Sequence, residues 1–144
     1  MVWGAIRADG RRVIKLYERS VNQYYYQEIL NEALLEIYTT RFKFQQDGAT
    51  CHTAHSTKDF LIRKNIRLLE NWPAQSADLS IIENLWDKLK VEVKNRNPRS
   101  IDELWNVTRE EFYKIPNDYI KKLYGSLPDR VMKVIHSKGG NTKY

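Results

Sequence analysis

The chain has 144 residues, of which 24 are Lys or Arg and 18 are Asp or Glu, so its formal net charge is +6. This length suits one domain with a real core, and 42% hydrophobic residues argue against disorder. Because Cys51 is the single cysteine and neither a long apolar segment nor a secretory leader is evident, we expect an intracellular protein without a membrane span.

The first part of the chain predicts two strands followed by a helix. The β-branched and apolar runs 2–6 and 12–18 flank an Asp-Gly pair at Asp9, which is a strong signal for an antiparallel hairpin. Residues 21–39 then predict a helix with Asn22 as a candidate N-cap. Its apolar side chains at helical spacing are Tyr26, Ile29, Leu30, Ala33, Leu34 and Ile37.

The middle of the chain predicts a strand, a helix and another strand. Residues 42–47 alternate between apolar and polar side chains, so Asp47 is expected at the carboxyl end of a strand. Residues 53–64 predict a helix with Thr57, Phe60 and Leu61 on its inward face, and residues 66–69 predict a short strand. The expected order up to this point is β, β, α, β, α, β.

The segment 72–90 begins as a loop and continues as a helix. Ser80 is a candidate N-cap, with Glu83 three residues later as the second half of a capping box. Lys90 and Lys94 return to nearly the same helical angle as Glu83, so two ammonium groups border its carboxylate. An exposed charged face explains that pattern without any function. The apolar stripe of this helix is predicted to be Ile82, Leu85, Trp86, Leu89 and Val93.

Three more helices are predicted towards the end of the chain. Ser100 and Glu103 form a second capping box, and helices over 116–124 and 127–135 follow that helix. The tail 138–144 is expected to be loose. The buried stripe of the helix that begins after Ser100 is predicted to be Leu104, Val107, Thr108, Phe112 and Ile115.

Two carboxylates in this pattern are candidates for a metal site. Asp47 is expected to end a strand and Glu83 to begin a helix, and ligands of open α/β sheets gather at the carboxyl ends of strands. Oxygen ligands select hard cations such as Mg²⁺ or Mn²⁺, and a pair of such ions can promote phosphodiester cleavage. Spacing alone does not distinguish these two acids from any other pair.

The residues around the two acids carry a more specific signal. The stretches F-Q-Q-D-G-A-T-C-H-T-A at 44–54 and W-P-A-Q-S-A-D-L-S-I-I-E-N-L-W-D at 72–87 lie between M-V-W-G-A-I at 1–6 and S-L-P-D-R-V-M-K-V-I-H-S-K-G-G-N-T-K-Y at 126–144. In this order they resemble the catalytic domain of the mariner-like (Tc/mariner) transposases, in the Asp-Asp-Glu/Asp (DDE) superfamily. The resemblance implies one α/β domain over 1–144 with a ribonuclease H-like mixed sheet, flanking helices and a helical C-terminal extension.

The same resemblance implies an activity and a set of site residues. The activity is metal-dependent DNA strand cleavage and strand transfer, with Mg²⁺ or Mn²⁺ as the cofactor and transposon-end DNA as the partner. Asp47 and Glu83 match the second and third metal-binding acids. A homodimer and a nuclear location are further expectations. The residues that support the two acidic motifs are Gln45, Gln46, His52 and Asn84.

The match also implies what residues 1–144 lack. The family's first catalytic Asp lies on a strand before the M-V-W-G element, and its helix-turn-helix region lies further upstream. We therefore expect a truncated, inactive form, which leaves open whether the chain is an enzyme. Asp9 and Glu18 are the acids before the first expected helix, and neither matches the family motif. His52 suits a hydrogen-bonding role better than metal ligation, because hard Mg²⁺ prefers oxygen.

Two other functions remain open at this stage. One is a fragment that holds nucleic acid without cutting it, and the other is a decayed element with no selected activity. Phosphate contacts would make DNA affinity fall steeply with added salt. The basic side chains that favour DNA binding are Lys88, Lys90, Lys94, Arg96 and Arg99.

Overall fold

The computed structural model describes residues 1–73 and 79–137. The loop expected before Glu83 falls partly on residues 74–78, which lie outside the described residues, as does the tail 138–144. No helix in the described ranges is long and apolar enough to cross a bilayer.

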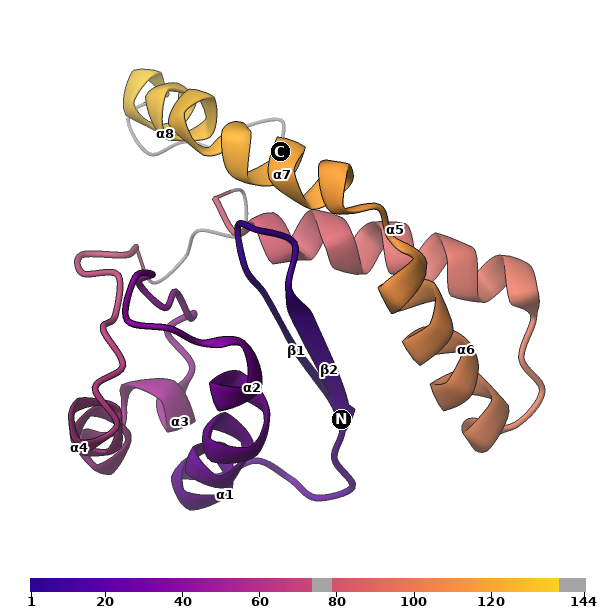
Figure 1. The fold of residues 1–144 in the computed structure, drawn as a ribbon, viewed down its shortest axis with the longest axis horizontal. Helices are drawn as coiled ribbons and strands as arrows, with labels where there is room; N and C mark the ends of the chain where they lie inside the picture. Colours follow the sequence, from indigo (N-terminus) through magenta and orange to yellow (C-terminus); the bar gives the residue numbers. More distant parts are fainter. Residues whose placement is uncertain (74–78, 138–144) are drawn as a thin grey trace. The chain divides into compact units, whose positions relative to one another are not determined.

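The contacts of the chain divide it into two compact units, and each is described by itself. The first unit contains Met1–Ala5 and residues 15–73. The second contains Ile6–Ile14 and residues 79–137. Figure 1 shows the elements of both along the chain.

The predicted hairpin is confirmed. Strands β1 (Val2–Ile6) and β2 (Arg12–Leu16) form a two-stranded sheet. In the turn, the Gly10 N–H donates to the Arg7 carbonyl at 2.9 Å, and Gly10 has a φ of 94°. Glycine adopts this positive φ without the steric cost that a Cβ would add.

The predicted first helix forms, with one feature that the apolar spacing did not show. It runs through α1 (Gln23–Ile29), the π turn η1 (Leu30–Leu34) and α2 (Leu35–Ile37). Asn22 is the N-cap, and its side chain accepts two N–H groups of the first turn at 3.1 and 2.9 Å. The buried side chains of this helix are Tyr26, Ile29, Leu30, Ala33, Leu34 and Ile37.

The helix predicted over residues 53–64 is confirmed as α4 (His55–Arg63), and a short helix that the pattern did not predict, α3 (Thr50–Thr53), precedes it. Both helices pack on α1. The Thr57 hydroxyl donates to the Cys51 carbonyl at 2.8 Å, which satisfies a buried polar group. The inward positions predicted for α4 are confirmed, because Thr57, Phe60 and Leu61 are buried.

The two strands predicted next to these helices are wrong as regular strands. Over 42–47 and 66–69 the structure has one isolated parallel bridge, between Phe44 and Leu68. The Phe44 N–H donates to the Arg67 carbonyl at 2.7 Å, and the Leu69 N–H donates to the Phe44 carbonyl at 2.8 Å. The alternating pattern therefore correctly indicated extended chain, but the pairing ends after one residue.

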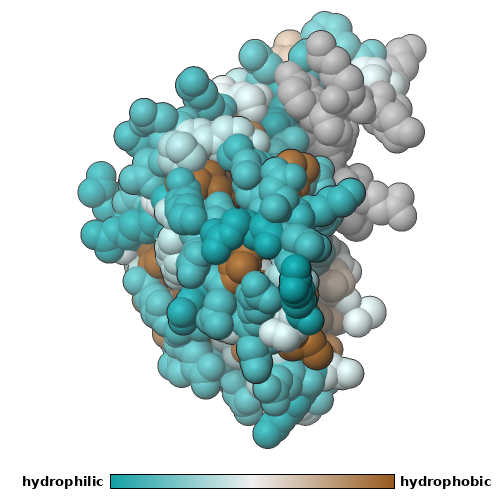
Figure 2. Space-filling view, turned by 90° about the vertical axis from the view of Figure 1, so that its right-hand side faces the viewer, coloured by the Kyte–Doolittle hydropathy of each residue, from teal (hydrophilic) through white to brown (hydrophobic). Residues whose placement is uncertain are grey.

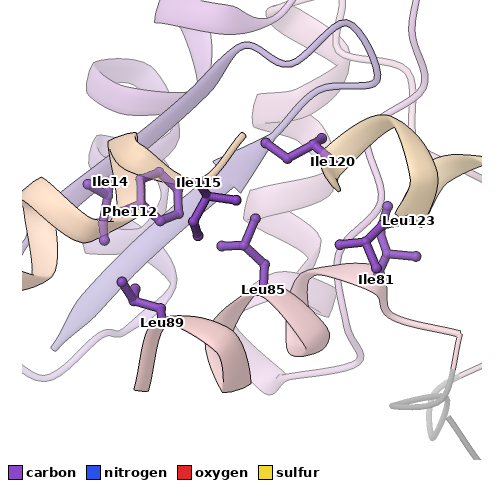
Figure 3. Close-up of a cluster of buried hydrophobic side chains, with 8 residues drawn as sticks. All are labelled: Ile14, Ile81, Leu85, Leu89, Phe112, Ile115, Ile120 and Leu123. Atoms are coloured by element: carbon purple, nitrogen blue, oxygen red, sulfur yellow. The ribbon is translucent and has the colours of Figure 1, made fainter. Parts of the chain in front are cut away.

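The second unit is built mainly from four helices. These are α5 (Ile81–Arg96), α6 (Ile101–Lys114), α7 (Asn117–Gly125) and α8 (Leu127–His136). Helix α5 packs on α6 and α7. Figure 3 shows the buried cluster made by β2, α5, α6, α7 and the residue that follows α6: Ile14, Ile81, Leu85, Leu89, Phe112, Ile115, Ile120 and Leu123.

Four details of these helices bear on the sequence prediction, and one of them confirms it. Ser80 precedes α5 as expected, but its side chain makes no capping hydrogen bond, so the predicted capping box there is wrong. Ile81 is buried, whereas Ile82 is half-buried. Leu104 is 45% exposed rather than buried. The second N-cap is confirmed, since the Ser100 hydroxyl accepts the backbone N–H of Glu103 at 3.1 Å.

Candidate functional site

Asp47 lies in the loop between the Phe44 bridge and α3, and its side chain is 70% exposed. Its Oδ1 accepts a hydrogen bond from the Ala49 N–H at 3.1 Å. Asp favours this kind of turn because its side chain can bind the backbone two residues further along the chain. The same Oδ1 lies 2.6 Å from Nδ1 of His52. No hydrogen bond to Oδ2 is made within the described part of the chain, so one carboxylate oxygen is fixed and the other is open.

His52 holds this carboxylate from a sheltered position. Its side chain is 18% exposed, and its ring lies against the ring of Tyr26, with centroids 4.1 Å apart. The geometry supports the hydrogen-bonding role that the sequence favoured for His52 over direct metal ligation.

Gln46 forms side-chain hydrogen bonds with both Tyr26 and His52. The Tyr26 hydroxyl donates to Oε1 of Gln46 at 2.7 Å, and Nε2 of Gln46 donates to the His52 carbonyl at 3.2 Å. Burial raises the pKa of the Tyr26 hydroxyl, so it keeps its hydrogen across the physiological range. Gln45 is half-buried and makes no side-chain hydrogen bond with the described residues.

Sequence reasoning missed Tyr26 as a site residue. It was predicted only as an apolar position of the first helix. The available signal was chemical, because a buried tyrosine hydroxyl needs a hydrogen-bond partner. Gln46 has the amide oxygen that such a hydroxyl needs, but 20 positions separate it from Tyr26, so the sequence does not indicate the contact.

Glu83 is exposed in the first turn of α5, and its backbone N–H donates to the Ser80 carbonyl at 3.1 Å. A carboxylate is favourable there because of the positive end of the helix dipole. The Tyr119 hydroxyl donates to the carbonyl of the neighbouring Asn84 at 3.4 Å, while the buried Oδ1 of Asn84 has no hydrogen-bond partner among the described residues. Since Asp47 and Glu83 belong to different units, a site shared by the two acids stays a prediction.

The chemistry of these oxygens fits a divalent cation in part. The open Oδ2 of Asp47 and the exposed carboxylate of Glu83 are the oxygen donors that Mg²⁺ and Mn²⁺ prefer. However, no group of three His, Cys, Asp or Glu side chains suited to a metal occurs among the residues that the structure describes. Either carboxylate would therefore need further ligands to hold an ion.

The basic side chains predicted to bind DNA are partly occupied by carboxylates. Lys88 lies 3.5 Å from Glu92, and Lys90 lies 3.2 Å from Asp87. Arg96 contacts two carboxylates of α6 at 2.6 and 3.2 Å, and these hydrogen bonds raise its pKa. These three residues thus offer less free positive charge than the sequence suggested.

Lys94 and Arg99 differ from the other members of this group. Neither forms an ion pair with any described residue. The ammonium group of Lys94 and the guanidinium group of Arg99 are therefore available to a polyanion. The backbone N–H of Arg99 donates to the Glu103 carboxylate at 2.7 Å, which fixes the chain there and leaves the side chain free. Figure 2 shows one face of the molecule on which apolar spots are small and separated by hydrophilic side chains.

Comparison with known proteins identifies the family. A family described as DDE superfamily endonuclease matches residues 1–105. The chain belongs to this family. It is 35% identical over 150 residues to the Tc3 transposase of Caenorhabditis elegans, covering all of this chain and 45% of the relative. It is 30% identical over 148 residues to the Tc1 transposase of the same organism, again over the whole chain and 54% of the relative. The chain thus spans about half the length of these curated relatives.

Solved structures show that the DDE fold is shared as well. The catalytic domain of Mos1 mariner transposase matches with a TM-score of 0.82 at 21% identity, over 99% of this chain and 75% of that one. A structure of that domain and Raltegravir with Mn matches with a TM-score of 0.83 at 23% identity, over 99% and 76%. The predicted ribonuclease H-like α/β fold is therefore confirmed.

Proposed function

We propose that this chain takes part in metal-dependent DNA strand cleavage and strand transfer, with Asp47 and Glu83 as two of the metal-binding carboxylates. The observation that carries the proposal is the arrangement of Asp47, whose Oδ1 is held by His52 and a backbone N–H while Oδ2 stays open. The transposase relatives, and the Mos1 catalytic domain structure with Mn, support the same reaction class.

Each residue has a separate task in this proposal. Asp47 and Glu83 would contribute oxygen ligands to Mg²⁺ or Mn²⁺, and the ion would supply the charge that activates a water and stabilises the leaving oxygen. His52 holds Oδ1 of Asp47, which leaves Oδ2 open for a cation. Transposon-end DNA, a homodimer and a nuclear location belong to the same proposal.

Metal binding can be tested without any DNA. A ligand that binds only the folded state raises the melting temperature, so Mn²⁺ is expected to raise that of residues 1–144. Asp47→Asn and Glu83→Gln should each reduce the rise, because each removes a charged oxygen ligand. Asp118→Asn is a matched control, because the Asp118 side chain is 84% exposed in α7 and, within the part of the chain that the structure describes, pairs with Lys121. A melting curve that neither Mn²⁺ nor Mg²⁺ changes would contradict the proposal.

A second candidate function is DNA binding without cleavage, which the unpaired Lys94 and Arg99 favour. If both contact phosphates, DNA affinity falls steeply with salt, and each change to Gln lowers the slope of log affinity against log salt by about 1. Lys90→Gln is the control, since Asp87 already neutralises Lys90. Equal slopes for all three variants and the parent chain would exclude these two residues as phosphate contacts.

A further inference from the structure

The loop that carries Asp47 is closed by a ring of side-chain contacts. Nδ1 of His52 meets Oδ1 of Asp47 at 2.6 Å, and Nε2 of Gln46 donates to the His52 carbonyl at 3.2 Å. Gln46 directly precedes Asp47 in the chain. Both Gln46 and Asp47 are therefore hydrogen-bonded to His52, so a movement of His52 would also move the Asp47 carboxylate.

The Tyr26 hydroxyl and the His52 carbonyl together set which way the Gln46 amide faces. The Tyr26 hydroxyl donates to Oε1 of Gln46 at 2.7 Å, so the amide oxygen is turned towards the helix and the NH₂ group towards the loop. With a donor on one side, the amide presents its own donor to the His52 carbonyl on the other. A flipped amide would place its oxygen against the His52 carbonyl, so that two acceptors face each other, and would take the acceptor Oε1 away from the Tyr26 hydroxyl.

Tyr26 also holds the imidazole ring itself. Its ring centroid lies 4.1 Å from that of His52, with the planes inclined by 32°. Tyr26 is 1% exposed and is fixed in α1, so it gives the imidazole a rigid surface. Because a carboxylate only accepts hydrogen bonds, Nδ1 of His52 must carry the hydrogen that it shares with Asp47.

We infer that Tyr26 is a positioning residue for Asp47, acting through the Gln46 amide and the His52 ring to keep Oδ2 open to a divalent cation. This rests on the proposed function, in which Asp47 is a metal ligand. Partners that orient a metal ligand commonly change metal affinity by 10- to 100-fold when they are removed.

The test uses two variants of residues 1–144 that keep the bulk of the core. Tyr26→Phe keeps the ring and removes the donor to Gln46. Gln46→Glu keeps the acceptor for Tyr26 and removes the donor to His52. Tyr38→Phe is the matched control, since it removes a hydroxyl that accepts the Arg67 N–H at 2.9 Å elsewhere in the same unit.

Two measurements are made on each variant. Nitrogen-15 NMR of the imidazoles reports which ring nitrogen carries the hydrogen, and the chain has only three histidines to assign. Mn²⁺ affinity is measured by electron paramagnetic resonance. We expect the Nδ1-protonated signal of His52 to be lost or shifted, and Mn²⁺ affinity to fall by about 10-fold, in both Tyr26→Phe and Gln46→Glu but not in Tyr38→Phe.

The two measurements separate failure of this inference from failure of the proposed function. An unchanged His52 signal in Tyr26→Phe would overturn the inference, as would a changed signal with unchanged Mn²⁺ affinity. If the parent chain binds no Mn²⁺, the proposed function is wrong. Tyr26 then cannot position a metal ligand, so the inference is wrong as well. An equal loss of Mn²⁺ affinity in Tyr38→Phe would also overturn the inference, because the removal of any tyrosine hydroxyl from this unit would then lower the affinity.

Discussion

At the scale of single residues, Asp9 stabilises the turn of the hairpin. Its Oδ1 accepts Nε of Arg7 at 2.8 Å and the Arg11 N–H at 3.2 Å. The hydrogen bond from Arg7 lowers the pKa of Asp9 from 3.8 to about 2. The stabilisation is therefore present above pH 3.8 and is lost as the pH falls through about 2.

Asp9→Asn is expected to lower the free energy of unfolding at pH 7 but to have little effect near pH 2. The loss is less than about 1 kcal/mol, because the carboxylate is partly exposed and solvent screens the pair. Urea unfolding at both pH values measures it, with Asp118→Asn as the exposed control. An equal loss at the two pH values would show that the charge of Asp9 is not the cause.

The residues of the site were predictable to different degrees for physical reasons. Asp47 and His52 lie five positions apart, so their contact is local and their types suggest it. Tyr26 reaches Gln46 across 20 positions, and only the packing of α1 on α3 brings them together. The sequence contains the groups, but the distance between them depends on tertiary structure.

At the scale of elements, Arg12 of β2 binds the end of α6. Its guanidinium donates to the carbonyls of Phe112 and Ile115, and to Oδ1 of Asn117 at 2.8 Å. The last carbonyls of a helix lack partners within the helix, so this cation satisfies groups that would otherwise need water.

Arg12→Met is expected to destabilise the protein by about 1.5–3 kcal/mol, because hydrogen bonds to a charged group are lost and the acceptors stay behind. Arg12→Lys should recover only part of this, since an ammonium cannot reproduce the planar fork of the guanidinium. Chemical denaturation measures both. Arg11→Met serves as the control, because Arg11 is exposed in the turn. A loss no larger than that of the control would mean that water replaces Arg12 at no cost.

Helices were predicted better than strands because their hydrogen bonds are local. The 3.6-residue period located α4, α5 and α6. Ile82 and Leu104 were predicted to be buried and are more exposed than that. A strand also needs a neighbour with the right register, which the alternation of 42–47 cannot supply. The structure pairs this stretch at one point, Phe44 with Leu68.

At the scale of the whole molecule, residues 1–144 by themselves are expected to show no detectable DNA cleavage. Two-metal catalysis needs carboxylates that bridge and flank both ions, and the described residues contain no three-ligand cluster. Each ~1.4 kcal/mol of lost transition-state stabilisation lowers the rate tenfold. The assay incubates the chain with transposon-end DNA and Mn²⁺.

The matched comparison is a chain extended at its N-terminus by a family strand that bears the first Asp. Cutting by the extended chain alone supports the prediction. Metal-dependent cutting by residues 1–144, abolished by Glu83→Gln, would contradict it. Another carboxylate, such as Glu18, would then supply the missing ligand.

The π turn η1 makes the first helix unusually tolerant of a lost residue. Deleting one residue from an ordinary α-helix rotates everything after it by about 100° and turns its buried face outward. A π turn already contains one residue more than an α turn needs, so deleting the exposed Asn31 should convert it into plain α-helix. Deleting the exposed Arg109 from α6 should unfold the second unit, whereas the Asn31 deletion should leave a cooperative thermal transition. Related chains that are one residue shorter in this helix would therefore keep the same buried face.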